Sequence, residues 1–327
     1  MNAAFNNTTK QISSNPFSGR GAADLCLMAI AVAGGEKAFK ERPMIIINML
    51  AVSPLQWSRE NLAAILALTK MGCPMIIGSE PQGGTTGPSP LAGQVMLNVA
   101  ETLAGITLVQ LLRPNTPIMW GNVGSISDMR SGLFASGAVE LGMLNAAMNQ
   151  MAKFYRVPTY STGGMSDSKG SDAQAGVEKS LQALTVALAG GNYIHDAAGL
   201  MESCLLCSYE QYVIDNEMLG MIARILDGIR VTPDTLSFDA IKQVGPRKNF
   251  MGLRHTLNHI KTEHYLPRLF DRATYETWET RGAKDIREVA REKAREILAT
   301  HKPEPLPKEV QEELKAIIRE AEEMYGK

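Results

Sequence analysis

The chain has few cysteines, few aromatic residues and almost no net charge. Its 327 residues include four cysteines, 6% aromatics, and 33 basic against 34 acidic side chains. Balanced charge gives no global field for nucleic acid or an anionic membrane. Four scattered cysteines do not make a disulfide framework, and no run approaches the roughly 18 apolar residues of a membrane span. No signal-peptide core stands at the start, so we expect a soluble, cytoplasmic protein.

Short apolar runs recur along the chain, separated by longer stretches rich in Ala, Leu and Met. The runs are Thr8–Ser14, Met44–Leu50, Pro74–Ser79, Pro117–Val123, Pro158–Gly163 and Tyr193–Ala198. Continuous apolar runs suit strands buried on both faces, and helices between them suit right-handed crossovers. The pattern predicts an α/β fold, either a barrel or a doubly wound sheet. In both folds function gathers in the loops that follow the carboxyl ends of the strands.

The composition changes near Gly282, where charged residues become frequent. We expect a barrel domain over residues 1–282 and a helical extension over 283–327, with helices at Asp285–Thr300 and Lys308–Met324. The second helix has a narrow apolar stripe, formed by Val310, Leu314, Ile317, Ile318 and Ala321. Such a stripe predicts packing against the barrel or against a neighbouring subunit.

The loop after the third run begins with Glu80 and continues through a glycine-rich segment, 81–90. Glycines before a helix can bind an anion through backbone N–H groups. The spacing matches neither a P-loop nor a dinucleotide fingerprint, so a tight turn is favoured. Glu80 remains a candidate site residue because it stands where a strand ends.

The loop after the fifth run concentrates polar residues behind two glycines, Gly163 and Gly164. Asp167 and Lys169 are candidate catalytic residues, and Asp172 is expected to cap the following helix. Lys169 resembles a Schiff-base nucleophile only weakly, because such a lysine normally projects from a strand into a dry pocket. We expect it to be ion-paired.

The sixth run places His195 two residues after Tyr193, on the same side of a strand. A lone strand histidine is more often hydrogen-bonded in a core than catalytic, so both interpretations stay open. Cys204 and Cys207 form a CxxC without a second pair, and their surroundings indicate the interior of a helix.

Three further histidines, His255, His259 and His264, stand at helical spacing. The neighbouring glutamate is placed wrongly for an HExxH zinc helix, so we predict no metal site.

Motifs spread over nearly the whole chain resemble the trimethylamine methyltransferase family of corrinoid-dependent methyltransferases. They are Asn7-Thr-Thr-Lys10, Gly84-Thr-Thr-Gly-Pro88, Leu91-Ala-Gly93, Asp128-Met-Arg-Ser-Gly132 with Glu140, Asp167-Ser-Lys169, Asp172-Ala-Gln-Ala-Gly176, Ser208-Tyr-Glu-Gln211, Val213-Ile-Asp-Asn-Glu217, His255-Thr256 with His259, and Pro267 to Arg272. The resemblance implies a TIM-type (β/α)8 barrel whose C-terminal mouth holds a methyl donor and docks a separate corrinoid protein.

The implied reaction moves a methyl group from a quaternary or tertiary methylamine to the cobalt(I) of that corrinoid protein, with no cofactor held tightly by this chain. A quaternary ammonium has no N–H, so its recognition needs aromatic faces and carboxylates. The expected substrate-binding residues are Glu80, Trp120, Tyr160, Tyr193, Tyr209, Glu210 and Phe250. The expected catalytic residues are Asp167, Lys169 and His195, with Gly163 and Gly164 contacting the cofactor. Trp120 has a second interpretation, as a core-filling ring.

Two departures from the family pattern matter. One family branch carries pyrrolysine, whereas every residue here is standard, so the chain is more similar to glycine betaine methyltransferases. Family members also have a segment before the position of Asn7, and six candidate strands fall short of the eight that close a TIM barrel. We therefore expect a barrel incomplete at its N-terminal strands, in a homo-oligomer or an assembly with the missing part. The alternative function is a catalytically incomplete fragment that assembles with a partner chain.

Overall fold

A parallel sheet of six strands forms the centre of the computed structural model, which describes residues 1–325. The strands are β1 (Ile12–Ser14), β2 (Ile45–Ala51), β3 (Met75–Ser79), β5 (Ile118–Asn122), β8 (Thr159–Thr162) and β9 (Tyr193–His195). Every neighbouring pair in the order β1-β2-β3-β5-β8-β9 is parallel. All six predicted strands are confirmed.

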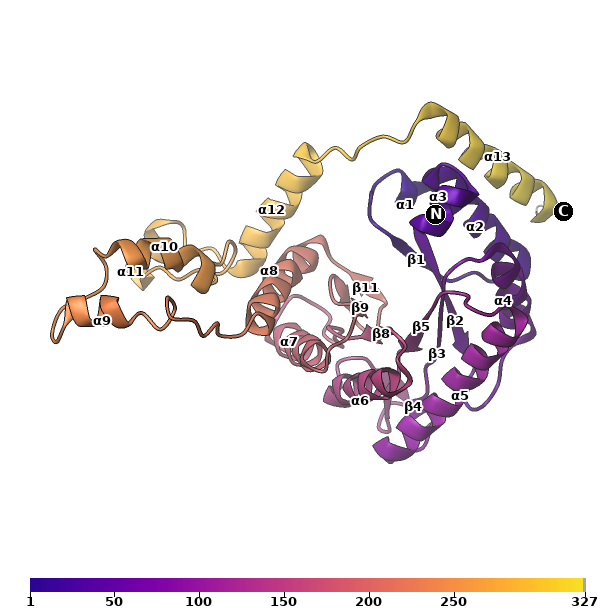
Figure 1. Cartoon of the computed structure of the whole chain (residues 1–327), viewed down its shortest axis with the longest axis horizontal. Helices are drawn as coiled ribbons and strands as arrows, with labels where there is room; N and C mark the ends of the chain where they lie inside the picture. Colours follow the sequence, from indigo (N-terminus) through magenta and orange to yellow (C-terminus); the bar gives the residue numbers. More distant parts are fainter. Residues whose placement is uncertain (326–327) are drawn as a thin grey trace.

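The strand order follows the chain order without reversal. A doubly wound sheet reverses its order at a switch point, whereas a singly wound sheet places its crossover helices on one face. Figure 1 shows this second arrangement, a curled sheet with helices around its outside. The sheet is therefore a half-barrel, and within residues 1–325 β1 and β9 each have one strand neighbour.

In the described part of the chain, eight helices surround the half-barrel, and four of them begin at a polar side-chain cap. The eight are α1 (Asn2–Phe5), α2 (Gly19–Ala33), α3 (Glu36–Glu41), α4 (Arg59–Met71), α5 (Leu91–Leu112), α6 (Val139–Tyr155), α7 (Ala173–Leu188) and α8 (Tyr209–Leu226). The side chains of Ser18, Ser58, Asp172 and Ser208 accept backbone N–H groups at the starts of α2, α4, α7 and α8. The predicted cap at Asp172 is confirmed.

The inner strands β2, β3 and β8 bury both of their faces, whereas the edge strands β1 and β9 are half-buried. On β2, Ile45, Ile47 and Met49 pack against the surrounding helices in the main core. Ile46 points the other way and meets Tyr160 in a smaller cluster inside the half-barrel. This double burial explains why the strands are apolar without alternation.

By length and composition, α5 could cross a membrane, in contrast to the expectation that no segment would. In the structure α5 packs against β2, β3 and β5. Its buried Glu101 accepts hydrogen bonds from the Ser53 hydroxyl at 2.8 Å and the Leu55 N–H at 2.6 Å. Because α5 connects the parallel neighbours β3 and β5, it is a crossover helix of the half-barrel.

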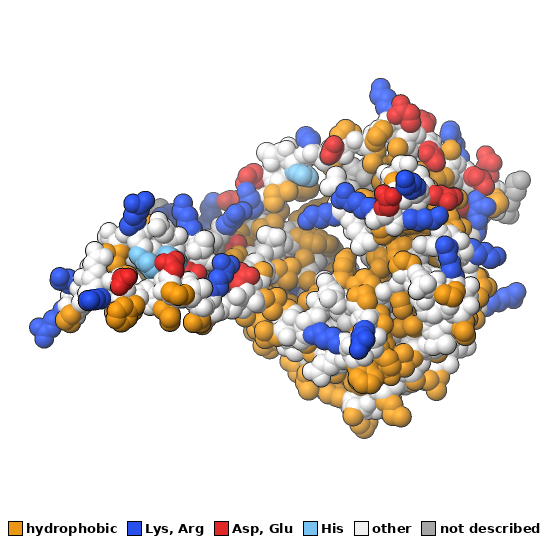
Figure 2. All heavy atoms as spheres, in the orientation of Figure 1, with side chains coloured by type: hydrophobic (Ala, Val, Ile, Leu, Met, Phe, Trp, Pro, Cys, Tyr) orange, Lys and Arg blue, Asp and Glu red, His pale blue; other side chains and the backbone are white. Residues whose placement is uncertain are grey.

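Beyond α8 the chain projects from the barrel as an arm, residues 229–285, and then returns (Figure 1). The arm carries α9 (Phe238–Val244), α10 (Arg254–Glu263) and α11 (Tyr275–Thr280), and the return carries α12 (Ile286–Thr300) and α13 (Lys308–Tyr325). Figure 2 shows charged side chains over the arm and α13, and hydrophobic ones over the barrel helices. The domain boundary at residue 282 stays a prediction. The chain already leaves the barrel after α8, at about residue 229.

The return segment is fastened to the barrel at both helices. Asp285 begins α12 with a capping box to Glu288, and α12 packs on α8. On α13, Leu314 is fully buried in the main core against α2, with Val310 and Ile317 beside it. The predicted packing of the apolar stripe against the barrel is confirmed.

Leu314→Ala should lower the free energy of unfolding by about 2–4 kcal/mol, because it leaves a cavity where the last helix meets the core. Urea denaturation followed by circular dichroism measures the change. The matched control is Leu298→Ala on α12, whose side chain is 58% exposed. Equal losses in the two variants would contradict the packing described for α13.

Candidate functional site

A cavity of about 660 Å³ lies on the inner face of the sheet, between β1 and β2 on one side and β8 and β9 on the other, and it reaches the carboxyl ends of β1 and β9. It is called the strand-end cavity below. It is lined by Ser13, Ser14, Asn15, Asn48, Tyr160, Tyr193 and residues 194–198. No lysine or arginine is among these lining residues. The cavity therefore favours a neutral or cationic ligand over an anionic one.

Aromatic rings form one wall of this cavity. Tyr160 on β8 and Tyr193 on β9 are register partners, and their ring centroids lie 5.1 Å apart in a stacked arrangement. The His195 ring also stacks on Tyr160, at 4.2 Å. The parallel register thus places three π systems side by side on the inner face of β8 and β9, where a cation can meet ring faces.

Polar side chains continue the wall towards β1 and β2. The Ser13 hydroxyl donates to Asn48 Oδ1 at 3.2 Å, and Asn48 Nδ2 donates to the Tyr160 hydroxyl at 3.2 Å. Burial raises the pKa of Tyr160 to about 12, so its hydroxyl stays protonated at neutral pH. This chain of bonds orients the Tyr160 ring.

His195 is held on both sides. Its Nε2 lies 2.6 Å from the Thr162 hydroxyl, and its Nδ1 lies 2.8 Å from Asp196 Oδ2. Asp196 has φ of 58°, a left-handed conformation that costs a non-glycine residue free energy. That backbone turn brings the Asp196 carboxylate beside the imidazole at the end of β9.

Glu80 contributes a second carboxyl group to this region. Burial, together with the negative charge of Asp196, raises its pKa from 4.5 to about 7. Glu80 therefore changes protonation near neutral pH. A buried carboxyl group beside another carboxylate is a frequent feature of functional sites.

A short hairpin, β10 (Leu200–Met201) with β11 (Leu206–Cys207), follows the cavity. Its turn has three consecutive left-handed residues, Glu202, Ser203 and Cys204. Partial loss of water around the Cys204 thiol, together with the charges of Asp196 and Glu80, raises its pKa to about 11. The prediction of a helix interior for the CxxC pair was wrong, since both cysteines are exposed and belong to the hairpin.

Asp167, a predicted catalytic residue, has its carboxylate occupied by protein donors. It accepts from the Ser136 hydroxyl at 2.7 Å, the Gly137 N–H at 2.9 Å and the Ser203 hydroxyl at 2.9 Å. These contacts join three loops. Lys169 is exposed and donates to the Asp167 carbonyl at 2.7 Å, so the expected ion pair with an aspartate does not form. In the structure, the Asp167 carboxylate holds these loops in position. Its catalytic role stays a prediction.

Gly163 and Gly164 sit between this loop and the chain after β9. A Cβ on Gly164 would lie 2.9 Å from Ala197 Cα, and Gly164 has φ of 92°. Both observations require glycine there for close packing. Contact of these glycines with a cofactor stays a prediction.

Five predicted substrate residues do not line the cavity, and Glu80, which lies near Asp196, is one of them. Trp120 points to the helix side of β5, where it packs on Met148 and Ala152. Neighbouring side chains on a strand point to opposite faces, and Met119 takes the inner one. The core-filling interpretation of Trp120 therefore fits, and the expectation that it faces the mouth was wrong.

The other three lie beyond the barrel strands. Tyr209 is 65% exposed in the first turn of α8, and Phe250 belongs to the arm. The Glu210 carboxylate accepts a hydrogen bond from Arg291 Nε of α12 at 2.8 Å, and this contact lowers the pKa of Glu210 to about 2. Glu210 therefore fastens α12 to α8 instead of facing a ligand at the strand ends.

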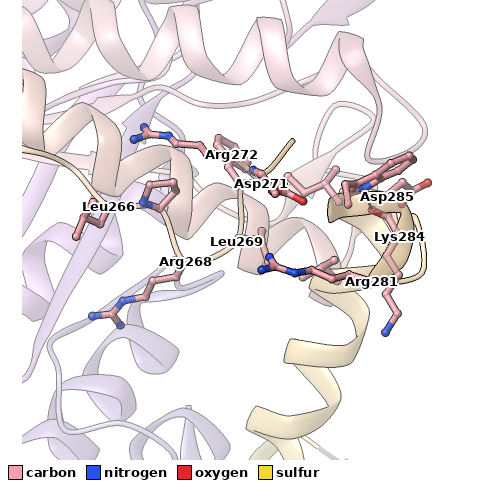
Figure 3. A pocket seen from close by; sticks show the side chains of 14 residues that line it. Leu266, Arg268, Leu269, Asp271, Arg272, Arg281, Lys284 and Asp285 are labelled. Carbon is pink, nitrogen blue, oxygen red and sulfur yellow. Dashed lines mark hydrogen bonds between the residues drawn. The ribbon is translucent and has the colours of Figure 1, made fainter. Parts of the chain in front are cut away.

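A larger cavity of about 940 Å³ lies between the chain at 266–273 and the start of α12 (Figure 3). Its charged lining is mainly basic, with Arg268, Arg272, Arg281 and Lys284 against Asp271 and Asp285. Asp285 is already engaged as the cap of α12. Excess positive charge does not suit a methylated ammonium ion, so the strand-end cavity is the better candidate.

The sequence reasoning missed several residues of the strand-end cavity. Asn48 and Ser13 are small polar residues inside apolar runs, and Asp196 was passed over beside His195. Their signal was position, because each lies near the carboxyl end of a predicted strand. Cys204 reaches the region only through the hairpin turn, which no spacing in the sequence indicates.

These observations define a class: a singly wound parallel α/β half-barrel with a polar, aromatic-walled cavity at the carboxyl ends of its strands. A sequence model of the trimethylamine methyltransferase (MTTB) family matches residues 1–326. The chain belongs to this family, as its motifs indicated.

Named relatives agree with this membership. The chain is 38% identical over 322 residues to a trimethylamine methyltransferase MttB of Desulfitobacterium hafniense, covering 98% of this chain and 64% of that protein. It is 35% identical over 305 residues to a glycine betaine methyltransferase of the same species, covering 93% and 64%. A trimethylamine methyltransferase MttB2 of Methanosarcina mazei is 34% identical over 292 residues, covering 89% and 59%. The chain thus spans less than two thirds of the length of these relatives.

Glu80→Gln should change how stability depends on pH. The pKa of Glu80 is about 7 in the folded chain against an ordinary 4.5, so the stability linked to its protonated form is complete below pH 4.5 and disappears as pH rises through 7. Between pH 4.5 and pH 8.5, wild type should lose about 2–3 kcal/mol of unfolding free energy that the variant does not lose. Urea denaturation at the two pH values measures this difference. The exposed Glu304→Gln serves as control, and the same difference there would contradict the assignment.

Proposed function

We propose that this chain binds a quaternary or tertiary methylamine in the strand-end cavity and presents its methyl group to the cobalt(I) of a corrinoid protein. One observation carries the proposal: stacked rings and the Asp196 carboxylate line one cavity, with the Glu80 carboxyl group nearby, in a chain of the trimethylamine methyltransferase family. In the same proposal the half-barrel is part of a TIM-type (β/α)8 barrel, whose functional mouth is at the carboxyl ends of the strands.

The cavity wall suits a methylated cation. The faces of Tyr193 and its stacked neighbours attract a cation through their quadrupoles, and Asp196 supplies negative charge without requiring an N–H donor. The lining carries no basic side chain apart from the imidazole of His195. A bound ammonium ion would also favour the ionised form of Glu80, because opposite charges at short range lower a carboxyl pKa.

In this reaction the corrinoid is a second substrate, delivered by its own protein, and its cobalt supplies the nucleophile for the methyl carbon. The chain supplies binding and alignment, which convert a bimolecular encounter into an oriented one. Tyr160, held by Asn48, and His195, held by Thr162 and Asp196, fix the wall against which the amine rests.

Methylation of a reduced corrinoid protein, followed by its absorbance, tests the proposal with glycine betaine, trimethylamine and tetramethylammonium as donors. Tyr193→Leu should lower the rate at subsaturating donor by about tenfold or more, because it removes a cation-binding face. Tyr209→Leu is the matched control and should leave the rate unchanged, since Tyr209 lies outside the cavity. If the folded chain transfers no methyl group to the corrinoid from any of these donors, the proposal is contradicted.

A specific observation favours a second candidate, in which the chain acts as a fragment that assembles with a partner chain. The curled sheet is open at β1 and β9 within the described residues, and open edges pair readily with other strands. Exposed apolar side chains on the barrel helices, among them Met96, Leu111 and Phe154, support the same interpretation.

Analytical ultracentrifugation separates the two candidates. The fragment hypothesis predicts species larger than the 35.5 kDa chain, or a stoichiometric complex with a polypeptide that supplies further strands. A compact, active monomer at high concentration would contradict the second candidate and leave the first intact.

A further inference from the structure

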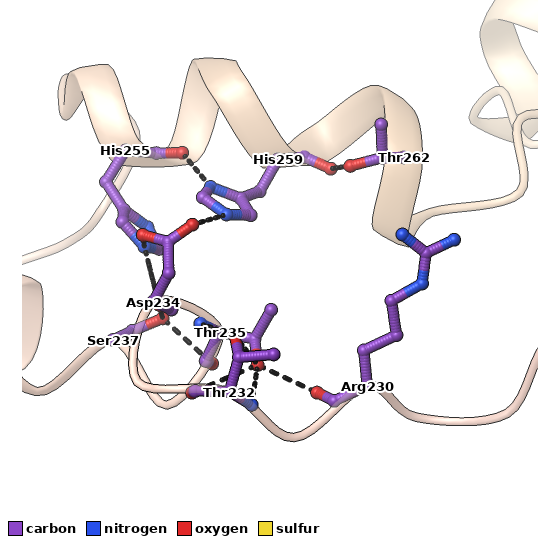
Figure 4. A network of polar contacts seen from close by, with 8 residues as sticks. All are labelled: Arg230, Thr232, Asp234, Thr235, Ser237, His255, His259 and Thr262. Atoms are coloured by element: carbon purple, nitrogen blue, oxygen red, sulfur yellow. Dashed lines mark hydrogen bonds and ion pairs between the residues drawn. The ribbon is translucent and has the colours of Figure 1, made fainter.

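The arm contains a cluster of metal-ligating side chains far along the chain from the strand-end cavity. Asp234, His255 and His259 each offer one ligand atom, and these atoms all lie within 4.8 Å of one another. Figure 4 shows the two imidazoles projecting from α10 towards Asp234 on the facing loop. The sequence showed the histidine spacing, but the carboxylate comes from 21 residues before His255, so the spacing alone could not reveal it.

The cluster has the internal geometry of a nearly assembled site. His259 Nε2 lies 3.0 Å from Asp234 Oδ2, and His255 Nε2 lies 3.8 Å from Asp234 Oδ1. The two imidazoles stack with centroids 4.2 Å apart, one helical turn from each other. Ligand atoms around a tetrahedral Zn²⁺ are about 3.4 Å apart, so small side-chain rotations bring all three into range.

Backbone contacts already orient the ligands. The Nδ1 of His259 lies 2.9 Å from the His255 carbonyl and can only donate to it, which leaves Nε2 as the nitrogen that faces Asp234. A ring fixed through its second nitrogen by a carbonyl is the usual arrangement behind a metal-bound histidine. The loop of Asp234 is fixed by hydrogen bonds between Thr232 and Thr235 and by one from Thr235 to the Arg230 carbonyl at 2.8 Å.

The arm also has little else to hold its elements together. Helix α10 buries none of its residues, and α9 buries only Ala240 and Val244. Segments with so little buried apolar surface generally need a metal, a disulfide or a partner to become rigid. A bridge between α10 and the loop at 230–237 would supply such a link.

We propose that Asp234, His255 and His259 form a Zn²⁺ site that fastens the loop at 230–237 to helix α10. Two imidazole nitrogens and one carboxylate oxygen are typical zinc ligands, and the fourth position is open to water. The site lies on the arm and takes no part in the proposed methyl transfer. Zn²⁺ binding would hold the loop at 230–237 against α10 and so make the arm more rigid.

Zinc titration of the tag-free, chelator-treated full chain tests the proposal, with a chromogenic competitor as readout. We expect one equivalent of Zn²⁺ per chain. His259→Ala should weaken binding at least tenfold, and so should Asp234→Asn, which preserves side-chain shape. His264→Ala is the matched control, because His264 is exposed and outside the cluster.

Limited proteolysis supplies an independent readout. Zn²⁺ should slow cleavage within residues 229–285 several-fold in wild type and His264→Ala, and have no effect in Asp234→Asn. Circular dichroism confirms that each variant is folded. The proposal is overturned if wild type binds no more tightly than Asp234→Asn, or if His264→Ala loses binding to the same extent.

Discussion

The carboxyl edge of the sheet depends on one buried ion pair. Lys179 of α7 and Asp215 of α8 are withdrawn from solvent, with Nζ 3.2 Å from Oδ2. Lys179 also donates to the carbonyls of Gly164 and Leu200, and Asp215 accepts the Gly199 N–H at 2.8 Å. Burial lowers the pKa of Lys179 and raises that of Asp215, while each charge opposes the shift of its partner. Since an unpartnered buried charge costs several kcal/mol, the loops after β8 and β9 are held to their helices as one unit.

The strands could be predicted because burial on both faces leaves its own signature in the sequence. All six runs became strands, and β2 extends one residue beyond the Met44–Leu50 run that predicted it. Their order could not be predicted, since a barrel and a doubly wound sheet use the same βαβ unit. Only the packing of the helices on one face distinguishes the two, and that is a tertiary property.

The same double burial limited the prediction of the site. A strand that alternates polar and apolar residues reveals which face a side chain takes, but an apolar run does not. Tyr160 and Tyr193 fell on the inner face and Trp120 on the outer one, although all three belong to apolar runs of the same kind. Tyr209, Glu210 and Phe250 were selected by residue type, without a strand end to place them. The Asp234 cluster depends on a loop folding back on α10, and neither helical spacing nor composition contains that information.

The proposed function also gives a role to a carboxyl group that titrates near neutrality close to this cavity. With Glu80 protonated, the strand ends carry the Asp196 charge without a second negative charge, which limits repulsion when the cavity holds only water. A methylated cation cannot donate a hydrogen bond, so it gains from charge density and ring faces alone. Ionisation of Glu80 on binding would then supply the second charge only when the ligand is present. In the proposed function, the raised pKa of Glu80 would thus couple the charge near the cavity to its occupant.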